Sequence, residues 1–246
     1  MQAGYFLLPL RSRPRFLDSD WLLMAGLERT DQPIRSFVLR QGRFSPGQRR
    51  ALEEDLPRYE FCAEHENDPQ SAFPSPQPLT VEIGFGNGES LLEMAADNPN
   101  QNFLGFEVHG PGVGHLVIGI KARGLSNLRV SQADAIPAIS RFPAESLAKL
   151  QTFFPDPWHK KKHHKRRMLK PAFLELAHRL LTPEGIVHVA TDWAPYAEEI
   201  GILFSSDARY VGVDAPSRPP TKYELRGERL GHAIQDLAIK KRVSFR

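Results

Sequence analysis

The sequence predicts an α/β fold, with a mostly parallel, twisted sheet and helices on both of its faces. From residue 79 onward, short apolar runs alternate with stretches of helical spacing. Strands buried on both faces read as continuous apolar runs, and a helix between two strands makes them parallel. A further observation is the glycine cluster behind the first run, in VEIGFGNGE (81–89), where a strand must turn tightly into a helix.

The predicted elements follow in order along the chain. Strands are expected at 79–84, 102–108, 127–132, 149–156 and 185–192, and near 209–214 and 233–241. Helices are expected at 89–98, 114–124, near 168–181 and at 194–206. The strand runs are short and apolar, whereas the helical stretches repeat their apolar residues at intervals of three and four.

The region before residue 79 predicts an extension of the main domain. Residues 1–33 have no clear periodicity and are expected to be irregular, whereas Ser45 before Pro46 is typical of a helix start. Four prolines in ten residues predict a linker: Pro69, Pro74, Pro76 and Pro78. Residues 34–78 are therefore predicted to be a basic helical extension with a Pro-rich linker, and residues 79–246 the catalytic domain.

Composition excludes several classes of protein. The 246 residues are 41% hydrophobic, enough for a full core. The single cysteine, Cys62, excludes a disulfide framework and a cysteine-based zinc site within one chain. No apolar run approaches the roughly 20 residues that span a bilayer, and no basic residues precede the apolar start. A cytoplasmic protein with no membrane partner is expected.

Basic residues are concentrated in one segment. Seven lysines and arginines lie in HKKKHHKRRMLK (159–170), and no acidic residue occurs from Pro157 to Leu174. The chain has 32 basic and 29 acidic residues, so without these seven it would have 25 against 29. Such clusters bind polyanions by releasing counterions from phosphates, although an arbitrary charge run is more often a solvated face.

The glycine cluster predicts a nucleoside pocket. Gly84, Gly86 and Gly88 lie where backbone must approach a ligand closely, but the third glycine comes one residue too early for a dinucleotide fingerprint. Glu89 at the helix start also suits a pyrophosphate poorly. A ligand without phosphates is therefore favoured over a dinucleotide.

Acidic residues near three strand ends make the pocket more specific. Glu107 ends the second strand, where a carboxylate accepts hydrogen bonds from ribose hydroxyls, and Asp134 follows the third strand. Together with Glu82 and the glycines they resemble an S-adenosylmethionine site on a Rossmann-like fold. In this interpretation Glu107 holds the ribose and Asp134 the adenine edge. Glu82 and the glycine loop lie under the methionine part.

The segment PDPW follows the fourth strand, where the methyl acceptor is expected. Asp156 lies between two prolines, which restrict its backbone. Trp158 provides a plane for an unstacked base, although a buried core tryptophan is about as common. His163 and His164 are adjacent, with no carboxylate ligand nearby, so RNA contacts or solvent are expected rather than a metal.

Six blocks of this sequence resemble the bacterial tRNA (guanine-N7-)-methyltransferase family, in the family's order. They are IRSFVLRQGR (34–43), VEIGFGNGESLLEMA (81–95), NFLGFEVHGPGVG (102–114), FFPDPWHKKKHHKRR (153–167), HVATDWAPYAE (188–198) and TKYELRGERLGH (221–232). The resemblance implies a class I methyltransferase fold, S-adenosylmethionine as cofactor and the variable-loop guanosine at tRNA position 46 as substrate.

The resemblance also implies roles for individual residues. Asp156 is expected to be the active-site carboxylate, and Glu82, Glu107, Asp134 and Asp156 the acids that contact the cofactor. The substrate contacts are expected to be Lys160, Asp192, Thr221, Lys222, Tyr223 and Glu224. The RNA-contacting residues are expected to be Lys162, His163, His164, Lys165, Arg166 and Arg167. Lys162 departs from the family, where Arg is frequent at this position, so the bidentate fork is lost there.

Other interpretations stay open at this point. Asp192 is also placed to be a helix N-cap, and the segment from Thr221 to be a helix start after prolines. An NAD-dependent oxidoreductase would use the glycine loop and Glu107, but Glu89 and the basic segment argue against it. An adenine or cytosine amino-methyltransferase orders its motif differently. An RNA-binding module with an inactive pocket would not need to retain four acids. A monomer and a homodimer are equally compatible with the sequence.

Overall fold

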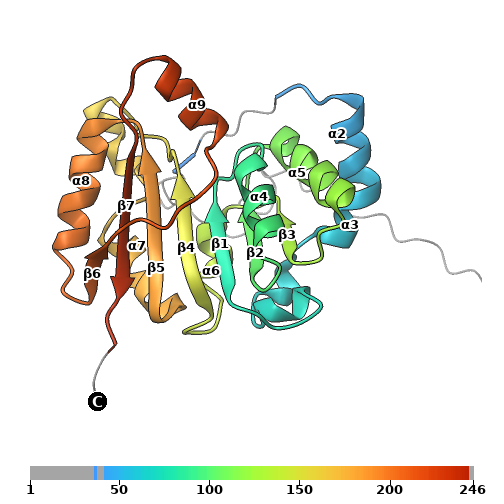
Figure 1. The fold of residues 1–246 in the computed structure, drawn as a ribbon, viewed down its shortest axis with the longest axis horizontal. Helices are drawn as coiled ribbons and strands as arrows, with labels where there is room; N and C mark the ends of the chain where they lie inside the picture. The colour runs from blue at the N-terminus through green and yellow to red at the C-terminus, as the bar shows by residue number, and fades with distance from the viewer. Residues whose placement is uncertain (1–35, 38–41, 244–246) are drawn as a thin grey trace, which may run out of the picture. The chain divides into compact units, whose positions relative to one another are not determined.

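The computed structural model describes residues 36–37 and 42–243. Within these residues the chain forms a seven-stranded sheet in the order β3-β2-β1-β4-β5-β7-β6 (Figure 1). The strands are β1 (Leu79–Ile83), β2 (Asn102–Phe106), β3 (Leu128–Ser131), β4 (Leu147–Phe153), β5 (Leu181–Thr191), β6 (Tyr210–Val213) and β7 (Gln235–Lys241). The first five strands pair in parallel, whereas β7 runs antiparallel between β5 and β6. The prediction of a mostly parallel sheet is therefore confirmed.

The helices lie between the strands as the alternation predicts. They are α2 (Pro46–Arg50), α3 (Leu56–Tyr59), α4 (Glu89–Asp97), α5 (Gly110–Arg123), α6 (Ala135–Ile139), α7 (Pro171–Leu180), α8 (Ala194–Ser205) and α9 (Lys222–Arg229). A π-helical turn, Ala51–Asp55, joins α2 to α3, and a 3-10 helix covers Lys161–Arg166. Within the described ranges, every helix is too short or too polar to cross a bilayer.

Several elements differ from the prediction, and β4 is one of them, since it covers Leu147–Phe153 instead of 149–156. Helix α5 begins at Gly110, four residues early, because Pro111 in its first turn needs no intrahelical N–H partner. Helix α6 was not predicted, since it is only one turn and a half long. Strand β5 begins at Leu181, where it pairs with Leu147 ahead of an irregularity in the ladder.

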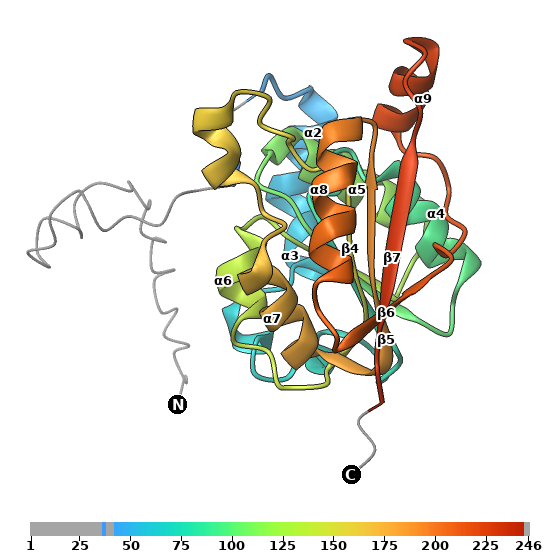
Figure 2. The same cartoon turned by 90° about the vertical axis from the view of Figure 1, so that its left-hand side faces the viewer.

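The sheet buries an apolar cluster on each face. One cluster joins β1 and β4 to α6, α7 and α8 through residues such as Val81, Leu150 and Phe173. The other joins the sheet to α4 and α5 through residues such as Leu91 and Leu116. Figure 2 shows α6 and α7 on one side of the strands and α4 on the other. With both faces covered, ligand access is left to the edge at the strand ends.

The described residues before β1 belong to the same compact unit as the sheet. Helix α2 begins as predicted, because Ser45 and Gln48 cap each other's backbone N–H groups at 3.2 and 2.8 Å. In the Pro-rich segment Phe73 is buried in the core, and Asn102 donates to the Ser75 carbonyl at 2.9 Å. This segment therefore packs on the sheet. The division into a basic helical extension with a Pro-rich linker (34–78) and a catalytic domain (79–246) stays a prediction, and residues 1–33 lie outside the described ranges.

Candidate active site

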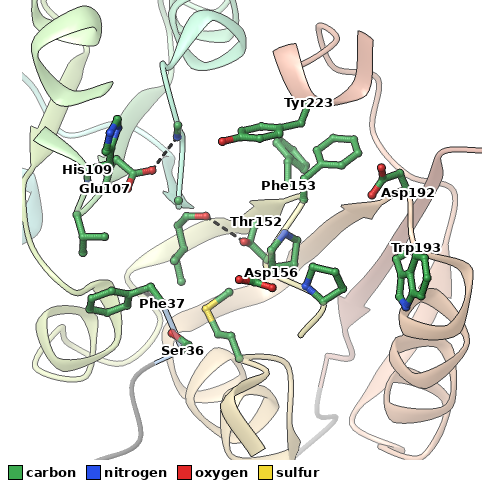
Figure 3. Close-up of a pocket in the computed structure, with 18 of the residues that line it drawn as sticks. Ser36, Phe37, Glu107, His109, Thr152, Phe153, Asp156, Asp192, Trp193 and Tyr223 are labelled. Atoms are coloured by element: carbon green, nitrogen blue, oxygen red, sulfur yellow. Dashed lines mark hydrogen bonds between the residues drawn. The ribbon is translucent and has the colours of Figure 1, made fainter. Parts of the chain in front are cut away.

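A cavity of about 710 Å³ opens at the carboxyl ends of β1, β2, β4 and β5. Figure 3 shows Glu107 and His109 on one side of it, Asp192 and Trp193 on the other, and Asp156 between them. Tyr223 reaches the cavity from α9. The order of the sheet reverses between β1 and β4, and open parallel sheets bind ligands outside such a reversal.

The glycine loop has a backbone that side chains disfavour. Gly84, Gly86 and Gly88 have φ values of 75°, 62° and 80°, in the left-handed region. Gly84 and Gly86 line the cavity, whereas Gly88 is the N-cap of α4, outside the lining. A Cβ on Gly112 would lie 2.0 Å from the Gly86 carbonyl oxygen. The loop and the start of α5 are therefore packed backbone to backbone, which leaves the cavity side open for a ligand.

Glu107 is oriented by the loops beside it. Its two carboxylate oxygens accept hydrogen bonds from the backbone N–H groups of Gly86 and His109, each at 2.9 Å. Each oxygen keeps a further lone pair, so a ribose diol can still donate to this carboxylate. Asp134 also lines the cavity, and its side chain caps α6 by accepting from the Ile136 N–H at 3.3 Å.

Glu82 lies beside the cavity rather than in its lining. It is 2% exposed, and its Oε2 accepts a hydrogen bond from the Gln151 side chain at 2.8 Å. Burial raises its pKa to about 7, against the lowering effects of the Gln151 hydrogen bond and the nearby Arg218. Oε1 of Gln151 is buried without a hydrogen-bond partner. A protonated Glu82 would be a suitable donor for it if the amide is turned over.

A pH effect on stability follows from the burial of Glu82. Since its folded-state pKa lies above the ordinary 4.5, its stabilising contribution is full below pH 4.5 and is lost as the pH rises to about 7. We expect wild type to lose on the order of 3 kcal/mol of unfolding free energy, relative to Glu82→Gln, between these limits. Urea unfolding without cofactor measures it, with the exposed Glu93→Gln as control. An equal pH dependence in wild type and Glu82→Gln would contradict it.

The tetrapeptide 155–158 is held in an unusual backbone. Phe154, just before the tetrapeptide, has a φ of 54°, and Trp158, its last residue, has a φ of 47°. Such angles cost a non-glycine residue roughly 1–3 kcal/mol each. Within it, Oδ1 of Asp156 accepts from the Trp158 N–H at 2.9 Å. The Asp156 side chain lines the cavity, so its second oxygen is available to a ligand there.

Trp158 is a core residue, not a stacking plane in the cavity. It is 9% exposed and donates from Nε1 to the Ser36 carbonyl at 3.1 Å. The Arg166 guanidinium lies 5.0 Å from its ring centre. Of its two interpretations, the buried one is therefore correct. The aromatic side chains that do line the cavity include Phe37, Trp193 and Tyr223.

The basic segment (residues 159–170) contains two kinds of residue. Lys160, Lys161, Lys162 and Lys165 are exposed, as an RNA contact requires. Arg167, in contrast, is 4% exposed, donates to the Pro157 carbonyl at 2.8 Å and pairs with Glu199. Its guanidinium also lies 4.6 Å from the ring centre of Tyr196. Arg167 is therefore not exposed for an RNA contact in this structure, and that expectation stays untested. Its side chain holds the tetrapeptide on α8.

His163, His164 and Arg166 lie between these extremes, each half-buried. His163 packs edge-on against Trp158 at 5.7 Å, and His164 lies 3.0 Å from Arg167 Nη2. Desolvation and the surrounding lysines and Arg166 lower the pKa of His163. Among the described residues one group has metal-ligand spacing, Cys62, Glu64 and His65, and these three do not line the cavity.

Asp192 faces the cavity rather than capping a helix. Trp193 is the N-cap of α8, so the N-cap interpretation of Asp192 is wrong. The Trp193 N–H donates a hydrogen bond to the Thr191 hydroxyl. Oδ2 of Asp192 lies 3.0 Å from His232 Nδ1, and both side chains line the cavity. The sequence motifs did not predict a site role for His232, although it ends the block TKYELRGERLGH.

In the segment from Thr221 to Glu224, two residues cap helix α9 and one lines the cavity. Thr221 and Glu224 form a reciprocal cap at the start of α9, with both hydrogen bonds at 3.1 Å. The helix-start interpretation is therefore correct for these two. Tyr223 lines the cavity, whereas Lys222 lines a neighbouring cleft between α4 and α9. Lys160 lies outside the cavity lining. Arg218, which pairs with Glu224, was also missed, because nothing in SRPP marks its arginine.

Comparisons with known proteins agree with the fold. Residues 76–237 match the family described as "Putative methyltransferase". The fold resembles the crystal structure of the aminoglycoside resistance methyltransferase NpmB1, with a TM-score of 0.51 and 17% identity. The resemblance covers 74% of this chain and 95% of that one, and it shows the fold alone.

Closer relatives are found among proteins named tRNA (guanine-N(7)-)-methyltransferase. The Alcanivorax borkumensis protein is 47% identical, over 85% of this chain and 92% of its own length. A Pseudomonas putida protein is 48% identical, over 88% of this chain and 94% of its own length. The Methylococcus capsulatus protein is 46% identical, over 85% of this chain and 94% of its own length. Identity at this level over nearly the whole of each relative is decisive. The chain belongs to the tRNA (guanine-N(7)-)-methyltransferase family.

Proposed function

We propose that this chain transfers the methyl group of S-adenosylmethionine to N7 of the guanosine at position 46, in the variable loop of tRNA. The observation that carries the proposal is one cavity that brings together Glu107, Asp134 and Asp156 beside an exposed basic segment. The first two acids suit a nucleoside, the third suits a base, and the lysines suit phosphates. The proposal names tRNA as the partner and includes neither a membrane nor a metal. A cytoplasmic location follows from the substrate.

The cavity suits both the methionine part and the adenosine part of the cofactor. The left-handed glycines present bare backbone where the methionine part would lie, near the buried Glu82. Glu107 would accept hydrogen bonds from the ribose, and Asp134 from the adenine amine. The bound cofactor supplies an electrophilic methyl group on a sulfonium. Glu82, Gly88 and Asp156 complete the proposed cofactor site. Of these, Asp156 lines the cavity, whereas Glu82 and Gly88 lie outside the lining and would support the glycine loop.

The reaction asks for alignment rather than a base. N7 of guanine has an exposed lone pair and no proton to remove, and positive charge develops on the base as it is methylated. Asp156 provides a fixed negative charge beside the base and can accept hydrogen bonds from guanine N1 and its amine. With Oδ1 held by the Trp158 N–H, this carboxylate needs little reorganisation. Trp193 and Tyr223 provide apolar surface for the base, and Asp192 a second acceptor.

The exposed lysines are proposed to bind the tRNA backbone, and His163, His164 and Arg166 to contact it from the half-buried side. Replacing Lys161, Lys162 and Lys165 with glutamine should reduce the dependence of log K on log salt by roughly two to three units. Turnover at saturating tRNA and low salt should stay near wild type, because none of the three lines the cavity. Binding titrations at several salt concentrations measure the slope.

The control for this experiment removes the same kind of charge elsewhere. Lys121, Arg123 and Lys240 are partly or fully exposed and do not line the cavity, and neutralising them should leave the slope unchanged. A wild-type slope in the lysine triple variant would show that the basic segment faces solvent. Loss of the slope in both variants would indicate a diffuse field instead of a defined contact.

The proposed reaction is tested by methylating a tRNA transcript with the purified protein and mapping the product by nuclease digestion and mass spectrometry. We expect one 7-methylguanosine, at position 46. A transcript with adenosine at position 46 is the matched control and should stay unmodified. Methylation of a different base, or of the control, would overturn the assignment of the substrate position.

A further inference from the structure

Arg218 lies at the centre of an ion-pair network beside the cavity. It belongs to the SRPP segment between β6 and α9, and its side chain is 5% exposed. Its guanidinium forms a two-pronged pair with Asp236, at 2.9 and 2.8 Å, and a further pair with Glu224. His188 holds the same Asp236 carboxylate at 2.7 Å.

The partners of Arg218 come from three separate parts of the fold. Asp236 lies on β7, and Glu224 closes the N-terminal cap of α9. The guanidinium also lies 4.6 Å from the ring centre of Phe153 and 5.9 Å from that of Phe154, just before the tetrapeptide. One planar group therefore joins the start of α9 to the strand end that carries Asp156.

Helix α9 has little else to hold it at its N-terminal end. Of its eight residues only Gly227 is buried, and Tyr223 and Leu225 are 59% and 42% exposed. An eight-residue helix without a packed apolar face is not stable by itself. Besides Arg218, Ser90 donates to the Pro219 carbonyl ahead of the helix at 3.1 Å, whereas the contact between Asp192 and His232, at 3.0 Å, lies beyond the other end of α9.

We infer that Arg218 is a positioning residue for methyl transfer, because it sets α9 and its Tyr223 against the strand end that carries Asp156. The inference rests on the proposed function. Tyr223 lies close to the glycine loop, since a Cβ on Gly86 would be 3.4 Å from its ring. A shift of α9 therefore moves the wall of the cavity that faces both cofactor and base.

The geometry requires arginine rather than any cation. Only a planar fork can pair with the Asp236 carboxylate through two hydrogen bonds and stack on Phe153 at the same time. A lysine at position 218 keeps the charge but offers one ammonium point. We therefore expect Arg218→Lys to fold and to bind cofactor, but to leave α9 poorly placed.

The experiment compares Arg218→Lys with Arg209→Lys in steady-state methylation and hydrogen exchange. Arg209 is a matched control, because it also forms a two-pronged pair with an aspartate, Asp207, and a pair with Glu175, away from the cavity. In Arg218→Lys we expect kcat to fall about tenfold or more, with KM for tRNA within about threefold, as for a loss of transition-state alignment. Exchange of residues 222–229 should accelerate, while that of 194–205 stays at the wild-type rate. Arg209→Lys should match wild type in both.

A double variant separates positioning from general damage. If Arg218 acts through Tyr223, then Arg218→Lys combined with Tyr223→Ala should be about as slow as the slower single variant, not slower by the product of both effects. Multiplying effects, or unchanged exchange in α9, would overturn the inference. Should Arg218→Lys fail to fold, Glu224→Gln tests the same link from the helix side.

The outcomes also distinguish this inference from the proposed function. Wild-type protein that methylates guanosine 46, beside an Arg218→Lys variant of equal kcat and exchange, would refute the positioning role alone. Wild-type protein that leaves tRNA unmodified would refute the proposed function. In that case the exchange rates of α9 in Arg218→Lys still decide whether Arg218 places this helix.

Discussion

Replacing Asp156 by asparagine should lower kcat by roughly a hundredfold or more, the cost of removing one preorganised charge from a transition state. Asparagine keeps the size of the side chain and can still accept from the Trp158 N–H, so the tetrapeptide is expected to keep its conformation. The negative charge beside the base is lost, and with it the stabilisation of the positive charge that develops on guanine. Single-turnover methylation with saturating tRNA measures the effect.

Binding measurements complete this test. Asp156→Asn should bind tRNA as wild type does, since the exposed lysines are intact. Asp97→Asn is the matched control, an exposed aspartate at the far end of α4 that should leave the rate unchanged. If Asp156→Asn methylates tRNA at a rate close to wild type, the carboxylate has no electrostatic role and the assignment of the active site fails.

Glu107→Ala should weaken S-adenosylmethionine binding by about tenfold or more, since hydrogen bonds to a charged group are worth about 1.5–3 kcal/mol each. Two causes act together. The ribose loses its acceptor, and the backbone N–H groups of Gly86 and His109 lose theirs, so the glycine loop is less well ordered. Calorimetric titration with cofactor measures the dissociation constant, and tRNA affinity should barely change.

A second variant removes only part of each contact. Glu107→Gln keeps one oxygen, which can accept from the N–H group of Gly86 or of His109 but not from both, so its binding defect should lie between wild type and Glu107→Ala. Glu53→Ala, an exposed glutamate away from the cavity, is the control. Unchanged cofactor affinity in Glu107→Ala would remove Glu107 from the cofactor site, whatever the state of the loop.

Two buried arginine side chains near the cavity have similar surroundings. Arg167 and Arg218 are both almost fully buried, both pair with a glutamate, and both lie beside an end of the tetrapeptide. The backbone at Phe154 and Trp158 is strained, and such strain persists only where the surroundings over-determine it. The two arginines provide that support, so in the proposed mechanism the placement of Asp156 depends on two cations whose side chains are almost fully buried.

Several features of this protein could be predicted from sequence because local signals determine them. The alternation of apolar strands and helices predicts the sheet, and Ser45-Pro46 predicts the start of α2. Three glycines in VEIGFGNG predict the left-handed loop, since other residues seldom adopt that backbone. Motif resemblance identifies the family, because six blocks keep one order over residues 34–232.

Other features depend on contacts between residues far apart in the chain, which no local pattern records. Trp158 is buried because its indole reaches Ser36, 122 positions away, and Phe73 because the Pro-rich segment folds back on the sheet. Arg167 and Arg218 have the same sequence signal as the exposed lysines, a positive charge near a motif. Their carboxylate partners arrive from α8, α9 and β7 only when the sheet has formed. Charge is therefore determined by sequence, whereas its use for binding RNA or for holding the site is decided by burial in the tertiary structure.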